Sequence, residues 1–389
     1  MTTDDRTSAG MVALAATIRA ARAGAPWWAA RLPDPGPGPM TPESLAALPV
    51  LRKSQLPALQ AADLPFGGLA ARPPAGFARL FLSPGPICEP GEGADTGAAR
   101  ALQAAGFGAG DILLNTFGYH LTPAGLMFDD AGRAAGGAVI PAGGGNTDQI
   151  VTAMRAYRPT AYAGTADYLN ILLTAADAAG VPVALTRAFL SGAAVTPTLR
   201  AAFTTRGIAV FELYGTAELG ILAYETPAHQ GMVLNDGFWA EIVAPGTGDP
   251  LPQGEVGELV VTLYRTAYPL IRFATGDLTA ILPSADGVAP PRLRGWMGRA
   301  DDAVKVKGMF LRPGMLADVL ATSPVTRARF VVDRVDERDR LTLEVEGAED
   351  PALGADLQRA VRSVTRLGCD LRWCAPGSIP QGPALADLR

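Results

Sequence analysis

The sequence YPLIRFATGD occupies residues 268–277, in a part of the chain whose character changes after Glu241. Residues 258–263 before it and residues 279–282 after it are short apolar runs that are typical of strands. The Thr-Gly-Asp that ends the stretch is, taken alone, typical of a turn, because glycine and aspartate favour turn conformations. We therefore predict that the stretch lies in a β-rich subdomain, and its place in the fold depends on the segments that flank it.

Toward the N-terminus, from residue 77 to about residue 282, short apolar runs alternate with Ala-rich helical segments. Residues 111–114 and 188–190 are two of the apolar runs, and residues 147–157 and 165–179 have helical spacing. Alternation of this kind predicts βα units and a largely parallel sheet.

Toward the C-terminus, a second change of character comes at residues 298–302. Beyond it the pattern predicts a strand, a helix, two strands and a final helix, at residues 303–306, 314–321, 328–333, 341–345 and 351–367. We therefore predict an α/β protein with two domains. The first is a large N-terminal α/β domain (residues 1–299) that includes the β-rich subdomain, and the second is a small α+β domain (residues 300–389).

The composition excludes several classes of partner. The net charge is −5 and there is no long run of like charge, so nucleic acid is not expected, because phosphate binding needs clustered Lys and Arg. No apolar stretch is long enough to span a membrane, and the acidic start of the chain does not resemble a secretory signal. The 3 cysteines form no framework, which favours a reducing cytoplasm, and with 2 histidines no zinc site is expected.

Four segments, in chain order, carry a resemblance to a known family. They are YGTAE (residues 214–218), YPLIRFATGD itself, GRADD (residues 298–302) with Lys307, Gly308 and Pro313, and PGSIP (residues 376–380). On these segments the chain is identified as a member of the adenylate-forming (AMP-binding) superfamily. It resembles phenylacetate–CoA ligases over roughly residues 77–389. The resemblance implies a large acyl- and nucleotide-binding domain and a small mobile domain that swings about a hinge at Asp301.

The resemblance also implies roles for the motif residues that handle the nucleotide. Asp277 would accept hydrogen bonds from two ribose hydroxyls, and Tyr214 would stack on the adenine. Glu218 would coordinate Mg²⁺ beside the phosphates, because this hard cation prefers carboxylate oxygen. Arg272 and Arg299 would pair with phosphate through their planar guanidinium groups.

The substrate-binding residues that the resemblance implies are Tyr119, Ser191, Gly192, Ala193, Tyr214, Gly215 and Thr216. The small residues 191–193 would let a flat acyl group slide between the backbone and Tyr214, and packing alone is their other interpretation. Lys307 would bind CoA, since the start of the small domain is locally basic through Lys305, Lys307, Arg312, Arg327 and Arg329. That basic face suits the phosphates of coenzyme A or an acidic carrier protein, and a solvated strand face is the alternative.

The departures from the family fall in the ATP-handling segments. The stretch that replaces the phosphate loop, residues 82–91, has three prolines, no lysine and the acidic Glu89. Proline removes amide donors, so ATP should bind there poorly. Ala217 stands where the family has a hydroxyl, and no lysine follows Lys307, although the family has a catalytic lysine near its C-terminus. ATP and Mg²⁺ are therefore doubtful cofactors for this chain.

The first choice of function is consequently ATP-independent transfer of an aromatic acyl group between thioesters, from coenzyme A to the phosphopantetheine thiol of an acyl carrier protein. His120 would be the general base that deprotonates the thiol, with Glu218 also in the catalytic site, and a packing or gating role is the alternative for His120. Two other functions stay open: an ATP-dependent acyl- or aryl-CoA ligase, and an inactive homologue that serves as a scaffold. The substrate in the first reading is a small aromatic carboxylic acid as its CoA thioester.

Overall fold

The computed structural model describes residues 3–93, 96–193, 195–282, 291–300, 304–307, 309–311, 315–321, 323–380 and 384–389. The chain forms two compact units, Met1–Ala300 and Asp301–Arg389. Asp301, the predicted hinge, lies outside the described residues. The mobility of the smaller unit therefore stays a prediction.

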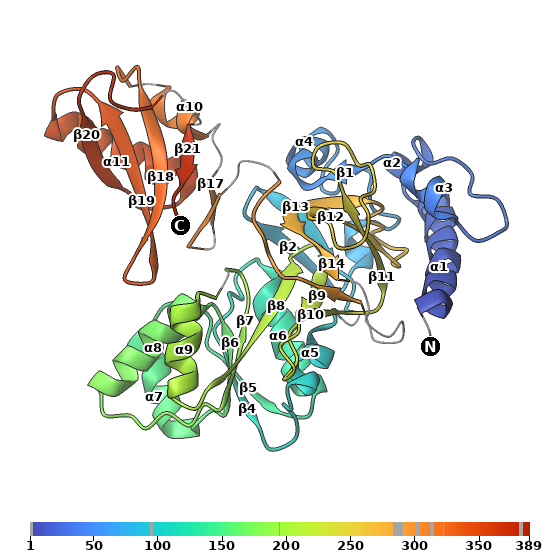
Figure 1. The fold of residues 1–389 in the computed structure, drawn as a ribbon, viewed down its shortest axis with the longest axis horizontal. Helices are drawn as coiled ribbons and strands as arrows, with labels where there is room; N and C mark the ends of the chain where they lie inside the picture. The colour runs from blue at the N-terminus through green and yellow to red at the C-terminus, as the bar shows by residue number, and fades with distance from the viewer. Residues whose placement is uncertain are drawn as a thin grey trace. The chain divides into compact units, whose positions relative to one another are not determined.

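A nine-stranded sheet is the centre of the large unit (Figure 1). Its strand order is β14-β15-β10-β9-β8-β7-β6-β4-β5. In chain order these strands are β4 (Ile112–Asn115), β5 (Ala138–Pro141), β6 (Ala161–Gly164), β7 (Arg187–Leu190), β8 (Ala209–Thr216), β9 (Gly220–Tyr224), β10 (Met232–Leu234), β14 (Ile281–Leu282) and β15 (Arg292–Leu293). The five strands from β5 to β8 pair in parallel, and the remaining pairs are antiparallel.

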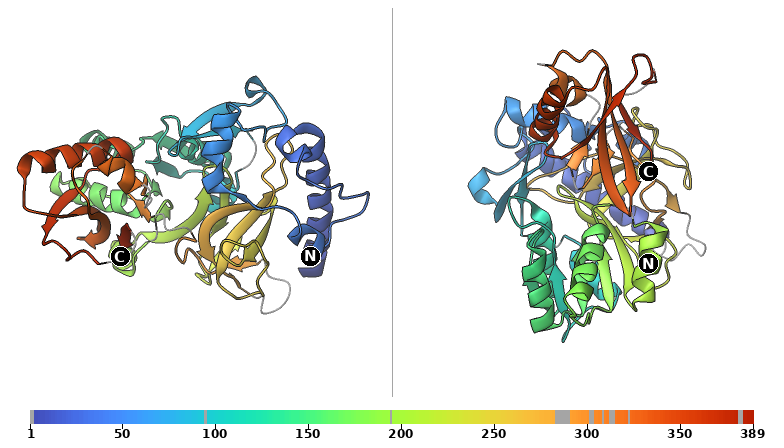
Figure 2. Two further views of the ribbon diagram at one scale, coloured as in Figure 1. Left: turned by 90° about the horizontal axis from the view of Figure 1, so that it is seen from above. Right: turned by 90° about the vertical axis from the view of Figure 1, so that its left-hand side faces the viewer.

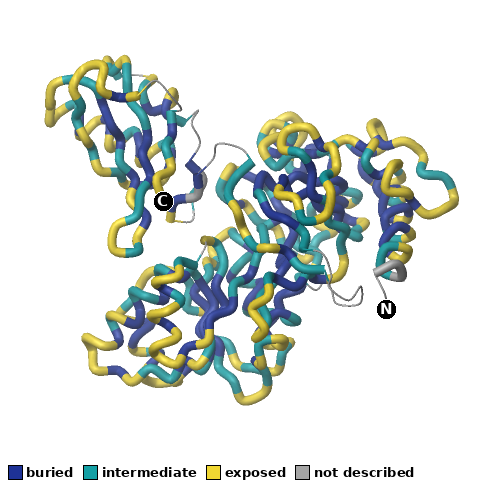
Figure 3. Tube along the Cα trace, in the orientation of Figure 1, coloured by how far each residue is buried: buried dark blue, intermediate teal, exposed yellow. Residues whose placement is uncertain are grey.

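Helices cover both faces of the parallel part of this sheet. They are α5 (Ala98–Ala104), α6 (Pro123–Ala134), α7 (Thr147–Tyr157), α8 (Ala166–Ala178) and α9 (Pro197–Thr205). The first two share a core with Phe189 and Phe211, and the other three share a second core with Tyr162 and Leu190. The inner strands are therefore buried along their length, as Figure 3 shows.

A four-stranded sheet forms the second layer of the large unit, in the order β1-β13-β12-β11. Its strands are β1 (Leu51–Arg52), β11 (Phe238–Val243), β12 (Gly257–Leu263) and β13 (Phe273–Thr279). Helix α1 (Thr3–Gly24) lies beside β11, and Met11 shares a core with Trp239 (Figure 2). The short helices α2 (Pro26–Ala29), α3 (Pro42–Ala46) and α4 (Leu56–Ala62) follow, and Trp28 Nε1 donates a 2.8 Å hydrogen bond to Pro269 O.

A separate hairpin is formed by β2 (Arg79–Ser83) and β3 (Ile87–Gly91). It replaces the loop that the sequence predicted at residues 82–91. The three prolines fit this hairpin. Pro84 and Pro86 lie in its turn, and Pro90 lies in β3, which is an edge strand because the sheet has two strands.

The small unit is a four-stranded sheet in the order β20-β19-β18-β21, with a hairpin and two helices. Its elements are β16 (Val304–Val306), β17 (Met309–Leu311), α10 (Met315–Leu320), β18 (Ala328–Val335), β19 (Arg338–Glu346), α11 (Pro351–Thr365), β20 (Asp370–Cys374) and β21 (Leu385–Asp387). Strands β18 and β19 are antiparallel, and each pairs in parallel with its outer neighbour.

The predicted α/β class is confirmed, and the predicted helices and strands of both units agree with the structure to within a few residues. The Thr-Gly-Asp that taken alone is typical of a turn lies in a strand, because β13 runs from Phe273 to Thr279 between β1 and β12. Strands β17, β20 and β21 of the small unit were not predicted.

Candidate active site

Three side chains meet at Asp277 in β13, and we call Tyr214, Asp277, Trp296 and Arg299 the Asp277 network. Tyr214 OH donates to Asp277 Oδ2 at 2.8 Å. Trp296 Nε1 and Arg299 Nη1 each donate to Oδ1 at 3.0 Å. The side chains of Asp277 and Arg299 are each 12% exposed. The acid and the cation of the network are therefore paired and largely buried, while Trp296 is exposed.

Tyr214 is positioned by an irregularity at the end of β8. The register between β8 and β9 shifts between Tyr214 and Gly215, and a Cβ on Gly215 would lie 2.5 Å from Gly220 O. Only glycine fits this bulge, which sets the direction of the tyrosine. Burial, together with the charge of Asp277, raises the pKa of Tyr214 well above its usual value. The tyrosine is thus a neutral donor at physiological pH.

Thr216 and the small residues after β7 also lie at the carboxyl end of the parallel strands, the edge where α/β sheets bind ligands. Thr216 Oγ1 accepts a 3.3 Å hydrogen bond from Leu219 N, so its hydroxyl is engaged in a local turn. Ser191 N donates to Gly164 O at 3.1 Å, and Gly192 has a φ of +90°. The loop with Ser191, Gly192 and Ala193 therefore lies at the predicted substrate edge, and its contact with an acyl group stays a prediction.

Glu218 is held by a lysine that the sequence did not predict. Lys53 Nζ donates to Glu218 Oε2 at 3.0 Å and lies 2.8 Å from Oε1. The Glu218 side chain is fully buried. Burial alone would raise the pKa of Glu218, but the charge and the hydrogen bond of Lys53 outweigh it and the pKa is lowered.

A second carboxyl, Glu89 in β3, lies near this pair. Ser83 Oγ donates to Glu89 Oε1 at 2.5 Å, and Glu89 is only 2% exposed. Burial, and then the charge of Glu218, raises the pKa of Glu89 to about 8. We call Lys53, Glu218, Glu89 and Ser83 the Lys53 cluster.

This arrangement does not fit Mg²⁺ at Glu218. Both carboxylate oxygens are within 3.0 Å of an ammonium group, and the side chain has no exposed surface at which metal-bound waters would fit. Among the described residues, no three His, Cys, Asp or Glu side chains come together as a metal site.

Arg272 does not take the phosphate-binding role that the sequence predicted. Its side chain is 1% exposed and pairs with Glu241 at 3.0 Å. It also donates to three backbone carbonyls, those of Ala46, Leu48 and Gly248, at 2.7 to 2.9 Å. These bonds occupy the N–H groups of its guanidinium, so Arg272 is unavailable to a nucleotide. It links the N-terminal segment to the four-stranded sheet instead.

The loop with Tyr119 and His120 follows β4. Asn115 Nδ2 donates to Tyr119 OH at 2.7 Å, and burial raises the pKa of Tyr119 to about 12. His120 is exposed, and Leu82 N in β2 donates to Leu121 O at 2.8 Å. The hairpin therefore holds the loop that carries His120, whose role as a general base stays a prediction.

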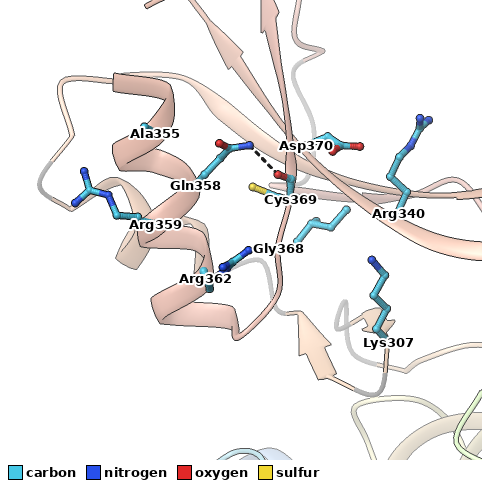
Figure 4. A pocket seen from close by; sticks show the side chains of 10 residues that line it. Lys307, Arg340, Ala355, Gln358, Arg359, Arg362, Gly368, Cys369 and Asp370 are labelled. Atoms are coloured by element: carbon cyan, nitrogen blue, oxygen red, sulfur yellow. Dashed lines mark hydrogen bonds between the residues drawn. The ribbon is translucent and has the colours of Figure 1, made fainter. Parts of the chain in front are cut away.

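In the small unit, Lys307 lies at an open hollow of about 490 Å³. Figure 4 shows Lys307 and Arg340 on one side of Cys369, and Arg359 and Arg362 of α11 on the other. Arg340 is paired with Asp333, and Arg359 is paired with Asp356, so much of this positive charge is already balanced.

The sequence also predicted a basic face from five residues, of which Lys305 and Arg312 have no described side chain. Arg327 pairs with Glu346 at 3.3 Å, and Arg329 pairs with Glu344 at 2.5 Å. The predicted face is therefore wrong for these two arginines. The binding of coenzyme A by Lys307 stays a prediction.

Sequence reasoning missed Lys53 and Trp296. Trp296 is two residues before the GRADD segment, and nothing in its local sequence marks it as a partner of Asp277. The rarity of lysine could have drawn attention to Lys53, since the chain has only three lysines, Lys53, Lys305 and Lys307, among 33 Lys and Arg residues.

The comparisons with known proteins agree with this fold. A sequence profile of the AMP-binding enzyme family matches residues 131–266. A crystal structure of 2-hydroxyisobutyryl-CoA ligase in complex with 2-HIB-AMP and CoA has a TM-score of 0.87 over 99% of this chain and 90% of that chain, at 23% identity. The class is therefore that of the adenylate-forming enzymes.

Two curated relatives narrow the class. Phenylacetate–coenzyme A ligase of Escherichia coli (strain K12) is 30% identical over 321 residues, which are 75% of this chain and 72% of that protein. The protein of the same name from Thermus thermophilus is 33% identical over 264 residues, which are 64% of this chain and 59% of that protein. The chain belongs to the phenylacetate–coenzyme A ligase family. Within the described residues, no helix has the length and apolar character that crossing a membrane requires.

Proposed function

We propose that the protein is an ATP-dependent acyl- or aryl-CoA ligase. In the first half-reaction a carboxylate oxygen attacks the α-phosphorus of ATP, and pyrophosphate leaves. In the second, the thiol of coenzyme A attacks the acyl carbonyl, AMP leaves, and the thiol proton passes to a base. An aromatic acid is the proposed substrate class, because the curated relatives are named for phenylacetate.

The observation that carries this proposal is the Asp277 network at the end of the sheet. It brings Tyr214, Asp277 and Arg299, which come from three separate motifs, into one hydrogen-bonded group. An aromatic ring, a carboxylate and a guanidinium suit, in turn, the base, the ribose and the phosphate of AMP. The second half-reaction needs a protein that keeps the acyl adenylate bound. Binding of its AMP part by the Asp277 network would meet this need.

Membership of a ligase family favours this function over ATP-independent transfer, the first choice from the sequence. One observation still favours the transfer as a second candidate. The Lys53 cluster and the β2–β3 hairpin stand where the family resemblance expects the metal and the phosphate loop. The acid could then enter as a ready-made thioester, with its acyl group passing from one sulfur to another and the proton of the incoming thiol returning to the leaving thiolate.

One experiment separates the candidates. The protein is incubated with phenylacetate, other aromatic acids, ATP and coenzyme A, and acyl-CoA, AMP and pyrophosphate are measured by mass spectrometry and ion chromatography. A parallel reaction contains phenylacetyl-CoA and a phosphopantetheinylated carrier protein without ATP. Acyl-CoA formed with equal AMP supports the ligase, and carrier acylation without ATP supports transfer. Neither product from any acid would favour the inactive scaffold.

A further inference from the structure

Glu218 occupies a motif position at which the family resemblance expects a ligand of a divalent metal ion, and Lys53 holds it instead. The two charges meet deep in the unit, with the Glu218 side chain fully buried and the Lys53 side chain 20% exposed. A metal ion at this carboxylate would have to displace an ammonium group that lies within 3.0 Å of both oxygens. Its remaining ligands, usually waters, would also have to fit beside a carboxylate that has no exposed surface.

The position of Lys53 is set by the backbone and not only by its charge. Strand β1 pairs in parallel with β13, with Leu51 opposite Phe273 and Arg52 opposite Ala274. Leu51 N donates to Arg272 O at 3.1 Å, and the 3₁₀ turn Lys53–Gln55 follows directly. The pairing of β1 with β13 in the four-stranded sheet thus places Lys53 beside Glu218.

The residue before Lys53, Arg52, pairs with a different carboxylate. Arg52 Nη1 lies 2.7 Å from Glu258 Oε2 in β12, one residue before Lys53 meets Glu218. Two successive cations therefore pair with two separate buried carboxylates. Removing a partner from such a buried pair leaves an uncompensated charge, so the pair is expected to persist.

We propose that Lys53 is the resident cation of Glu218 and takes the place of a divalent metal ion, so that this carboxylate binds no metal from solution. A divalent ion that takes part in the reaction would then arrive on the phosphates of the nucleotide. This inference concerns metal binding alone and does not depend on whether the acyl reaction is a ligation or a transfer.

The test measures the binding of Mn²⁺ to the full chain by electron paramagnetic resonance. The variants are Glu218→Gln, Lys53→Met, Lys53→Arg and Lys53→Met/Glu218→Gln. We expect the same Mn²⁺ binding in the wild type and Glu218→Gln. Lys53→Met leaves the Glu218 carboxylate without its ammonium partner, so its Mn²⁺ affinity should rise at least about tenfold, since carboxylates are preferred ligands of this ion. The gain should disappear in the double variant, and Lys53→Arg should show none.

Lys307→Met is the matched control, because it removes an exposed lysine of the small unit and should leave Mn²⁺ binding unchanged. If Lys53→Met does not fold, the comparison of the wild type with Glu218→Gln still decides. A stoichiometric Mn²⁺ site in the wild type that Glu218→Gln abolishes would overturn the proposal. So would an affinity for Mn²⁺–ATP that falls tenfold or more in Glu218→Gln, since no such dependence is expected.

Discussion

The Asp277 network and the Lys53 cluster each place a carboxylate at a motif position, and they differ in where the balancing cation comes from. Arg299, which balances Asp277, comes from another motif segment 22 residues away. Lys53, which balances Glu218, comes from a segment 165 residues away that carries no motif. The first pair is partly exposed and the second is buried around its carboxylate.

This difference teaches that a motif match fixes the type of residue but not the charge that faces it. Asp277 can exchange a protein donor for a ligand hydroxyl, because its side chain keeps some exposure, at 12%, whereas that of Glu218 has none. Glu218 cannot exchange Lys53 for a solvated metal ion without moving a buried charge. The proposal therefore keeps the role that the family resemblance implies for Asp277 and replaces the metal that it implies at Glu218 with Lys53.

The largest effect is expected from Lys53→Met, which breaks the buried side of the comparison. It leaves Glu218 uncompensated, and the free energy of unfolding of the large unit should fall by about 3–5 kcal/mol. Unfolding in urea is followed by tryptophan fluorescence, since four of the five tryptophans lie in this unit and Trp373 alone lies in the other.

Lys53→Met/Glu218→Leu should recover most of that loss, because an apolar pair of similar size needs no counter-charge. The control is Asp177→Asn, which breaks the exposed pair with Arg206 and should cost less than about 1 kcal/mol. A loss from Lys53→Met no larger than that of the control would show that the pair is not buried in solution.

Glu89→Gln tests whether Glu89 in the Lys53 cluster is protonated in the folded protein. The pKa of Glu89 is raised from 4.5 to about 8 in the folded protein, so between these values the native state holds a proton that the unfolded chain has lost. The stability of the wild type therefore falls as pH rises through this window. Gln cannot ionise, so the variant lacks this contribution.

The difference in unfolding free energy, variant minus wild type, should grow by about 3 kcal/mol between pH 5.5 and pH 7.5, at about 1.4 kcal/mol for each of the two pH units. It is measured by urea unfolding at both values. Contributions from groups whose surroundings are the same in both proteins cancel in the difference. A difference that stays constant over the two pH units would mean that Glu89 is already ionised in the native state.

Asp277→Asn tests the exposed side of the comparison. The amide keeps the size of the side chain but removes the charge that holds Arg299 and would accept the ribose hydroxyls. We expect kcat/KM for acyl-CoA formation to fall about a hundredfold, the effect of losing one preorganised electrostatic contact. Asp236→Asn, at an exposed pair with Arg100, is the matched control and should change the rate less than about twofold. Equal rates for the two variants would remove the Asp277 network from the site.

The sequence predicted much of the fold and about half of the site geometry. Periodic segments such as residues 147–157 were predicted correctly, because a helix between two parallel strands is encoded locally. The β2–β3 hairpin was not, since prolines and glycines read as a loop whether or not two edge strands pair around them. Tyr214, Asp277 and Arg299 were found together because three motifs converge on one place.

Arg272 and Lys53 show why the rest could not be predicted. The role of Arg272 depends on three carbonyls, two of them more than 200 residues away in the chain, which no local pattern reveals. Lys53 becomes a partner of Glu218 only because β1 joins β13, a parallel pairing of two residues. Both are consequences of tertiary structure that single-sequence patterns do not contain.

The smallest effect is expected from His120→Ala, at the loop that the hairpin holds. His120 is exposed, and within the described part of the chain no hydrogen bond or ion pair orients its side chain. A loss near tenfold is therefore expected, below the hundredfold of an oriented base. The rate of acyl transfer to coenzyme A is measured from pH 6.5 to pH 9, for the variant and the wild type. A general base matters while the thiol is protonated, so the ratio of the two rates should approach one as pH nears the thiol pKa of about 8.5. A ratio that is independent of pH would assign His120 to packing or gating, and the base for the thiol would then have to be sought elsewhere or in solvent.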